Sequence, residues 1–182
     1  MIEITSLEIP EVKLIKPQQF SDNRGFFVEL FNYQNLKAQG IDFTPLQDNL
    51  SFNSYKHTLR GLHAQLEPYP QAKLVSCLRG SIVDVIVDAR RSSKTYGKYV
   101  SITLSQDDYS FIYIPCGFLH GFKTLNDETI VLYKTNNYYA PLNEVGIKWN
   151  DPELQIDWGD TTNLIISEKD QQNFLFTEVN VA

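Results

Sequence analysis

The chain has 182 residues, of which 42% are hydrophobic and 21% are charged, as in an ordinary globular protein with one sizeable core. Its formal net charge of −6 argues against nucleic acid as a partner, because a phosphate backbone requires a basic face. The sequence has neither an apolar run long enough to span a membrane nor the apolar core of a signal peptide. We therefore expect a single cytoplasmic domain over residues 1–182.

The first part of the chain predicts short strands and one helix. Residues 11–16 predict a strand, and residues 21–27 predict a turn that leads into a second short strand. Residues 32–40 predict a helix that begins after the N-cap Asn32 and stops at Gly40.

The middle of the chain has an apolar pattern of period two. Residues 81–88, 99–105 and 129–135 each alternate, so that, for example, Val85 and Ile86 lie on opposite faces of one strand. Turn residues separate these runs, and little helix is predicted between them. Many short strands at near-regular spacing predict a mainly β fold, an antiparallel sandwich or barrel.

The last third of the chain predicts two short helices. One covers residues 150–156 with Asn150 as its cap, and the other covers residues 167–173 with Ser167 as its cap. Asp170 follows Ser167 by three residues, the spacing of a capping box.

One strand, residues 59–65, contains His63 among apolar neighbours. The ordinary explanation of such a histidine is a buried ring with satisfied nitrogens, and the chemical explanation is proton transfer near neutral pH. Strict alternation puts Arg60 and His63 on opposite faces of this strand, unless Gly61 forms a bulge.

A proton-transfer site requires a base, an acid and a group that stabilises negative charge. His63 is the candidate base and Asp170 the carboxylate that would fix its tautomer, although Asp170 is also explained by the capping box. Tyr133 could supply a proton from another side, and Lys73 could stabilise an oxyanion. Tyr133 is also explained as a packed strand aromatic.

The sequence also contains candidates for an anion site but lacks the pattern of a metal site. Four cationic or ionisable residues are candidates for binding an anion, with surface salt bridges as the alternative for each: Arg24, Arg60, His120 and Lys169. A cupin-type metal site would have histidine at the position of Gln65, two residues after His63, and we therefore expect no metal. Glycine-rich phosphate loops are absent from the sequence.

Seven stretches of the chain, in order, resemble one family: FSDNRGFFVELF (20–31), LQDNLSFN (46–53), LRGLHAQ (59–65), QAKLVSCLRGSIVDVIVDARRSSKTYGKY (71–99), IPCGFLHGF (114–122), VLYKTNNYYAPLNEVGIKWNDPELQIDW (131–158) and ISEKD (166–170). LRGLH followed by IP-x-GF-x-HGF and LYKT is highly specific. The chain is similar to the dTDP-4-dehydrorhamnose 3,5-epimerases over nearly its whole length. A departure is Ala64, where many members have an aromatic residue.

The resemblance implies a cupin-type jelly-roll barrel with a few short helices, a homodimer, and catalysis without metal or cofactor. It assigns the catalytic base to His63, its acidic partner to Asp170, the acid to Tyr133 and enolate stabilisation to Lys73. Tyr139 is expected beside the sugar. The substrate-binding positions that it implies are Arg24, Glu29, Gln47, Asp48, Asn49, Arg60, Lys73, His120, Tyr139, Glu144 and Lys169.

The implied reaction is epimerisation at C3 and C5 of a dTDP-4-keto-6-deoxy-hexose, from dTDP-4-dehydro-6-deoxy-glucose to dTDP-4-dehydro-L-rhamnose. One alternative is epimerisation at C3 alone in a rare-sugar pathway. Alternatives from other classes are a cupin that binds a sugar nucleotide without catalysis and a metal-dependent cupin enzyme.

Overall fold

The computed structural model describes residues 2–179 and residue 181, and most of its regular structure is β-strand. The elements are β1 (Glu3–Ser6), β2 (Lys13–Lys16), β3 (Gln19–Asp22), β4 (Gly25–Val28), α1 (Tyr33–Ala38), β5 (Gln47–Asn53), β6 (Thr58–Gln65), β7 (Lys73–Arg79), β8 (Ser81–Asp88), β9 (Tyr99–Ser105), β10 (Phe111–Ile114), β11 (Phe118–Thr124), β12 (Thr129–Thr135), η1 (Pro141–Asn143), β13 (Glu144–Gly146), β14 (Ile165–Ile166), α2 (Glu168–Gln171) and η2 (Phe176–Glu178).

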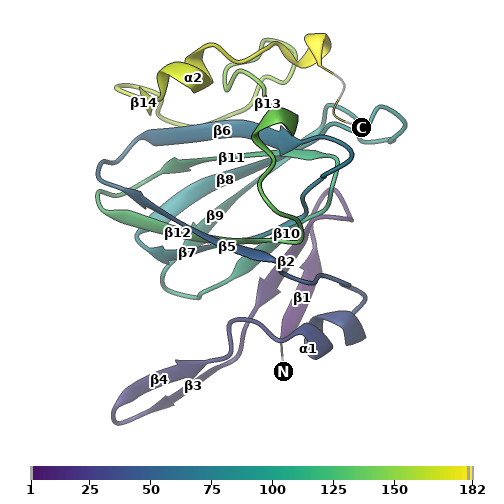
Figure 1. Cartoon of the computed structure of the whole chain (residues 1–182). Coiled ribbons are helices and arrows are strands. Elements are labelled where there is room, and N and C mark those ends of the chain that lie inside the picture. Colours follow the sequence, from purple (N-terminus) through teal and green to yellow (C-terminus); the bar gives the residue numbers. More distant parts are fainter. Residues whose placement is uncertain (1, 180, 182) are drawn as a thin grey trace.

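Two large sheets form the barrel (Figure 1). The strand order of the first sheet is β1-β2-β10-β7-β12-β5, and that of the second is β13-β6-β11-β8-β9, with β14 also paired to β6. The neighbours on these two paths are antiparallel, whereas β14 runs parallel to β6. The hairpin β3–β4 extends away from the barrel, and α2 lies beyond β6 (Figure 1). The prediction of a cupin-type antiparallel barrel is confirmed.

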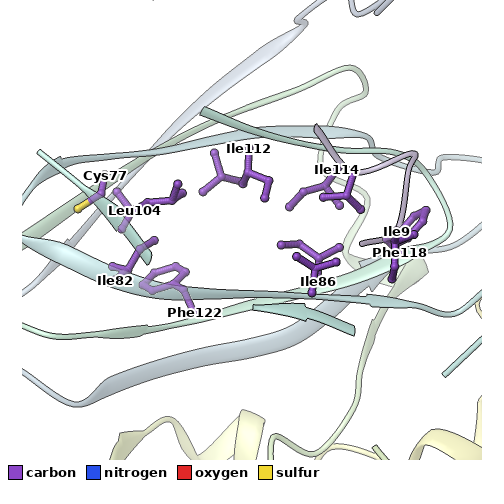
Figure 2. Packing of buried hydrophobic residues seen from close by; sticks show 13 residues of the cluster. Ile9, Cys77, Ile82, Ile86, Leu104, Ile112, Ile114, Phe118 and Phe122 are labelled. Carbon is purple, nitrogen blue, oxygen red and sulfur yellow. The ribbon is translucent and has the colours of Figure 1, made fainter. Parts of the chain in front are cut away.

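An apolar core fills part of the space between the two sheets. Ile112 and Ile114 of β10 lie opposite Ile82 and Ile86 of β8, and Phe122 of β11 joins the same cluster (Figure 2). Each of these side chains is buried, and full burial of one such side chain contributes about 1.5–3 kcal/mol to folding. This core packs the sheets together and leaves the remaining interior for polar groups.

The other face of the second sheet is covered by the C-terminal part of the chain. Val85 and Val87 of β8 belong to a cluster with Leu154, Trp158 and Phe176. The predicted alternation in residues 81–88 is therefore confirmed, because the valines and the isoleucines pack in different layers. The same C-terminal part of the chain includes α2, whose residue Asp170 lies against β6.

The predicted helices have different outcomes. α1 begins after Asn32, whose Oδ1 accepts the N–H of Asn35 at 3.1 Å, and α2 begins after Ser167, as predicted. The helix predicted over residues 150–156 is wrong, since the chain forms a turn there. The buried carboxylate of Asp151 accepts backbone N–H groups within that turn and also the N–H of Phe176, which ties the turn to η2. β1 was not predicted.

A β-bulge changes the phase of β6. His63 pairs with His120 of β11, and Arg60 pairs with Phe122, so two residues of β6 lie opposite Gly121 alone. The extra residue turns Arg60 to the same side as His63. Strict alternation would have separated these two side chains, and the bulge at Gly61 is the exception that brings them together.

Glycine is required at this bulge because two backbones approach closely. Gly61 has a φ of +104°, and a Cβ atom on it would lie 2.6 Å from the carbonyl oxygen of His120 and 2.8 Å from the Cα of Gly121. Both contacts are with backbone, which cannot move aside as a flexible side chain can. The bulge therefore depends on the absence of a side chain at this position.

We predict that Gly61→Ala lowers the free energy of unfolding by about 3 kcal/mol, since both φ and the close approach oppose a Cβ atom. Gly40→Ala is the matched control, because Gly40 has a φ of +86° but no atom within 4 Å of the added Cβ. We expect this control to cost about 1 kcal/mol, from φ alone. Urea unfolding measures both, and equal losses would contradict the role of the close approach.

Candidate active site

A cavity of about 670 Å³ lies between the two sheets. Strands β5, β7 and β12 line it from the first sheet, and β6, β11 and β13 line it from the second, with α2 at one side. Most of the predicted site residues border this cavity: Gln47, Asn49, Arg60, His63, Lys73, His120, Tyr133, Tyr139, Glu144, Lys169 and Asp170.

The His63 ring is hydrogen-bonded to a buried carboxylate. Its Nε2 lies 2.7 Å from Oδ1 of Asp170, whose residue is only 4% exposed. The other carboxylate oxygen of Asp170 accepts the N–H of Gly61 at 3.2 Å. Ser167 caps α2 by accepting the backbone N–H of Asp170 at 3.1 Å. Ser167 therefore acts as the N-cap of α2, but the capping box is not completed, because the Asp170 side chain bonds His63 and Gly61 instead of the backbone of Ser167.

The hydrogen bonds around Asp170 determine its charge. Burial raises the pKa of this carboxyl, but the hydrogen bonds from His63, Gly61 and Ser167 and the charge of His63 together bring the pKa below its ordinary value. Asp170 is therefore ionised at neutral pH. An ionised acceptor at Nε2 favours the tautomer of His63 that carries its proton there, which leaves the Nδ1 lone pair free to act as a base.

Lys73 and Tyr133 lie on the opposite sheet from His63. Withdrawal from solvent lowers the pKa of Lys73 to about 8, while the negative charges of Glu144 and Asp84 oppose that shift. Tyr133 packs against the apolar core, and burial raises the pKa of its hydroxyl above the ordinary value. At neutral pH the cavity thus holds a cationic lysine and a protonated tyrosine across from the imidazole.

A second imidazole in the cavity also contacts an aspartate. Nε2 of His120 lies 2.7 Å from Oδ1 of Asp84, and both residues are buried. Oδ2 of Asp84 has no hydrogen-bond partner among the described residues. We did not predict Asp84 as a site residue. The signal was its place on the inward face of β8, between the buried isoleucines Ile82 and Ile86.

Three charged or polar side chains form one rim of the cavity. Glu144 accepts a hydrogen bond from the ammonium of Lys169 and another from the hydroxyl of Tyr139 at 3.2 Å. Burial raises the pKa of Glu144, but its bond to Lys169, the charges of His63 and Lys169, and its bond to Tyr139 bring the pKa below the ordinary value. The rim therefore combines a fixed negative charge with a cation and an exposed aromatic ring.

Three predicted substrate-binding residues lie away from the cavity of their own chain. Arg24 sits at the turn of the hairpin β3–β4, paired with Asp22, and its side chain is 85% exposed. Glu29 follows that hairpin and bonds Asn35. Asp48 is on the outer face of β5, because alternation turns it away from Gln47 and Asn49, and it pairs with Lys134. Within one chain these three assignments are not supported.

The structure holds neither a cluster of metal ligands nor a membrane-spanning helix within its described residues. Within residues 2–179 and 181, no group of three or more His, Cys, Asp or Glu side chains could hold a metal ion. No helix in the described part of the chain is long and apolar enough to cross a membrane. Catalysis without metal and a cytoplasmic location both stay predictions.

The fold and the cavity define the class of the protein: it is a cupin-type barrel whose two sheets enclose a cavity lined by ionisable side chains, among them His63, Lys73 and Tyr133. The family model described as dTDP-4-dehydrorhamnose 3,5-epimerase matches residues 6–178. The chain belongs to the dTDP-4-dehydrorhamnose 3,5-epimerase family.

Relatives with that activity cover nearly the whole chain. The dTDP-4-dehydrorhamnose 3,5-epimerase of Sinorhizobium fredii is 44% identical over 177 residues, which are 97% of this chain and 91% of that protein. The dTDP-6-deoxy-D-glucose-3,5-epimerase of Legionella pneumophila, solved in complex with dTDP-4-keto-L-rhamnose, has a TM-score of 0.93 and 39% identity, covering 97% of this chain and 94% of the other.

A solved enzyme of narrower activity is also similar. The 3'-monoepimerase from Streptomyces bikiniensis, in complex with dTDP-quinovose, has a TM-score of 0.88 and is 30% identical over 94% of this chain and 87% of its own. The fold therefore accommodates both reactions, and the higher identity is to the 3,5-epimerases.

Proposed function

We propose that this protein epimerises C3 and C5 of dTDP-4-dehydro-6-deoxy-glucose and so forms dTDP-4-dehydro-L-rhamnose. The observation that carries the proposal is the hydrogen bond of 2.7 Å between His63 and the buried Asp170, on the sheet opposite Tyr133 and Lys73. The named activity of relatives that are 44% and 39% identical over nearly the full chain supports the substrate and the reaction.

The chemistry follows from the C4 ketone of the substrate, which acidifies the protons on C3 and C5. His63 would remove one of these protons through Nδ1, and the electron pair of the C–H bond would pass into an enolate. The ammonium of Lys73 would stabilise the enolate oxygen. Tyr133 would then donate its hydroxyl proton to the opposite face of the same carbon, which inverts that centre without net oxidation.

Positive charge in the cavity supports recognition of a diphosphate by a protein with net charge −6. Arg60 uses its Nε to hold Asn53 at 2.8 Å, which fixes the guanidinium at the cavity. Lys169 brings a further cation and hydrogen-bond donor to the same space, and His120 also borders it. Arginine is suited to this role because its planar fork matches phosphate oxygens. We propose that these groups bind the diphosphate and that Tyr139 lies beside the sugar.

We further propose that the protein works as a homodimer in which the hairpin β3–β4 reaches the cavity of the second copy. Two apolar surfaces support this arrangement. On the hairpin, Phe26 and Phe27 are 49% and 67% exposed, and on β5, Leu50 and Phe52 are 63% and 51% exposed. Covering these surfaces would remove large apolar side chains from water and carry Arg24 and Glu29 to the partner's site.

Incubation of dTDP-4-dehydro-6-deoxy-glucose with the protein in D2O tests the reaction, because each inverted carbon takes up solvent deuterium. We expect NMR to show deuterium at C3 and C5. His63→Ala and Tyr133→Phe should each lower kcat at least a hundredfold while the thermal unfolding temperature stays within a few degrees. Deuterium at C3 alone would identify a 3-epimerase. Near-normal turnover by His63→Ala would contradict the role of His63 as the base.

The pH dependence of kcat/KM tests the role of Lys73. Its pKa of about 8 means that the ammonium is present below that pH and lost above it. We therefore expect kcat/KM to fall toward tenfold per pH unit above about pH 8. Lys73→Arg stays charged throughout this range, so its lower activity should not decline there. A descending limb of the same midpoint in Lys73→Arg would assign it to another group.

Mixing two defective variants tests the dimer. Arg24→Ala and His63→Ala should each be poorly active alone at low substrate concentration. When the two chains are co-expressed, about half of the dimers are mixed, and each mixed dimer holds one intact site if the hairpin serves its partner, so about a quarter of wild-type activity should return. A hairpin that serves its own chain would restore nothing.

A further inference from the structure

Gln65 lines the cavity on β6, two residues after His63, and is 5% exposed. Its side-chain amide makes three hydrogen bonds to backbone. Nε2 donates to the carbonyl oxygens of Tyr69 and Tyr138, and Oε1 accepts the N–H of Ala140 at 2.8 Å. A buried side chain that makes these bonds holds two loops at the cavity rim, one after β6 and one after β12.

The bonds of Gln65 lie on either side of Tyr139. Tyr138 supplies the carbonyl before this residue, and Ala140 supplies the N–H after it. The N–H of Tyr139 itself donates to Oε1 of Gln47 at 2.9 Å, from β5 of the other sheet. The backbone around Tyr139 is therefore held from both sheets.

The ring of Tyr139 has little else to hold it. The residue is 51% exposed, and among residues 2–179 and 181 its ring makes one hydrogen bond, from the hydroxyl to Glu144 at 3.2 Å. Packing does not fix an exposed ring. The direction in which the ring leaves the backbone therefore depends on the hydrogen bonds that Gln65 makes to Tyr138 and Ala140.

The chemistry of an amide is needed at this position. The site requires one acceptor for Ala140 and donors for two carbonyls, and only a carboxamide supplies both. A carboxylate would accept from Ala140 but would face the two carbonyls without a proton. A methionine would fill the volume and leave the buried backbone groups without partners.

We infer that Gln65 is a positioning residue that orients Tyr139 at the entrance of the cavity and thereby controls substrate binding rather than the proton transfers. This inference rests on the proposed function, in which Tyr139 contacts the substrate. Where a cupin metal site would place a second histidine ligand, this chain uses a side-chain amide to hold the rim.

The test compares Gln65→Met and Gln65→Glu with Asn143→Ala. Asn143 is the matched control, since its side chain also bonds a carbonyl of the loop after β6, that of Glu67, without flanking Tyr139. We expect each Gln65 variant to raise KM and the Kd for dTDP-quinovose, a sugar nucleotide without the C4 ketone, roughly tenfold by titration calorimetry, with kcat changed less than threefold. Asn143→Ala should leave both near wild type.

A double-mutant cycle separates positioning from a general structural role. In a Tyr139→Ala background, Gln65→Met should raise KM and the Kd for dTDP-quinovose by less than twofold, because the ring that it positions is gone. The same rise in both backgrounds, or a loss of kcat without a change in KM, would overturn the inference.

The binding measurement keeps the two proposals distinguishable. A wild-type protein that binds dTDP-quinovose but exchanges no deuterium into dTDP-4-dehydro-6-deoxy-glucose would refute the proposed reaction, and the Gln65 variants would still report on Tyr139 through the Kd for dTDP-quinovose. If Gln65→Met is unfolded by circular dichroism, Gln65→Glu preserves the shape and the acceptor for Ala140 and carries the test. Wild-type affinity in the folded Gln65→Glu variant would overturn the inference.

Discussion

The hydrogen bond between His63 and Asp170 joins two parts of the molecule that have different tasks. Asp170 belongs to α2, at the end of a segment that covers the outer layer of the second sheet, whereas His63 belongs to the wall of the cavity. A buried carboxylate needs its partners, because a buried charge without them is costly. The packing of the C-terminal cover places Asp170 against His63 and Gly61, so folding itself sets the geometry of the base.

Much of the fold was predictable because alternation is a local property of the chain. The pattern in residues 81–88 assigned Val85 and Ile86 to different layers, and the structure packs them so. The helix expected over residues 150–156 failed for a reason that is not local. Asp151 accepts the N–H of Phe176, which is distant in sequence. The pattern within residues 150–156 contains no sign of this contact.

The site was predictable in composition rather than in arrangement. Motif resemblance named His63 and Asp170, but nothing in their spacing in the sequence could bring them within 2.7 Å. Asp84 was missed because the sequence shows it only as a polar residue on an apolar strand face. That position is also typical of a buried polar group with satisfied hydrogen bonds. The assignment of Arg24 stays a prediction for a different reason, because Arg24 lies on a hairpin outside the cavity of its own chain and a single chain does not show what that hairpin contacts.

The bulge at Gly61 fixes the length of the chain in its neighbourhood. Arg60 and His63 are separated by an odd number of steps along a strand, yet they share a side because one step is absorbed opposite Gly121. Removal or insertion of one residue between them would move each later side chain of β6 to the opposite face of the sheet. His63 and Gln65 would then enter the apolar layer of Trp158, and Ala64 would face the cavity. Evolution can therefore change this stretch by exchanging residues, but not by changing their number.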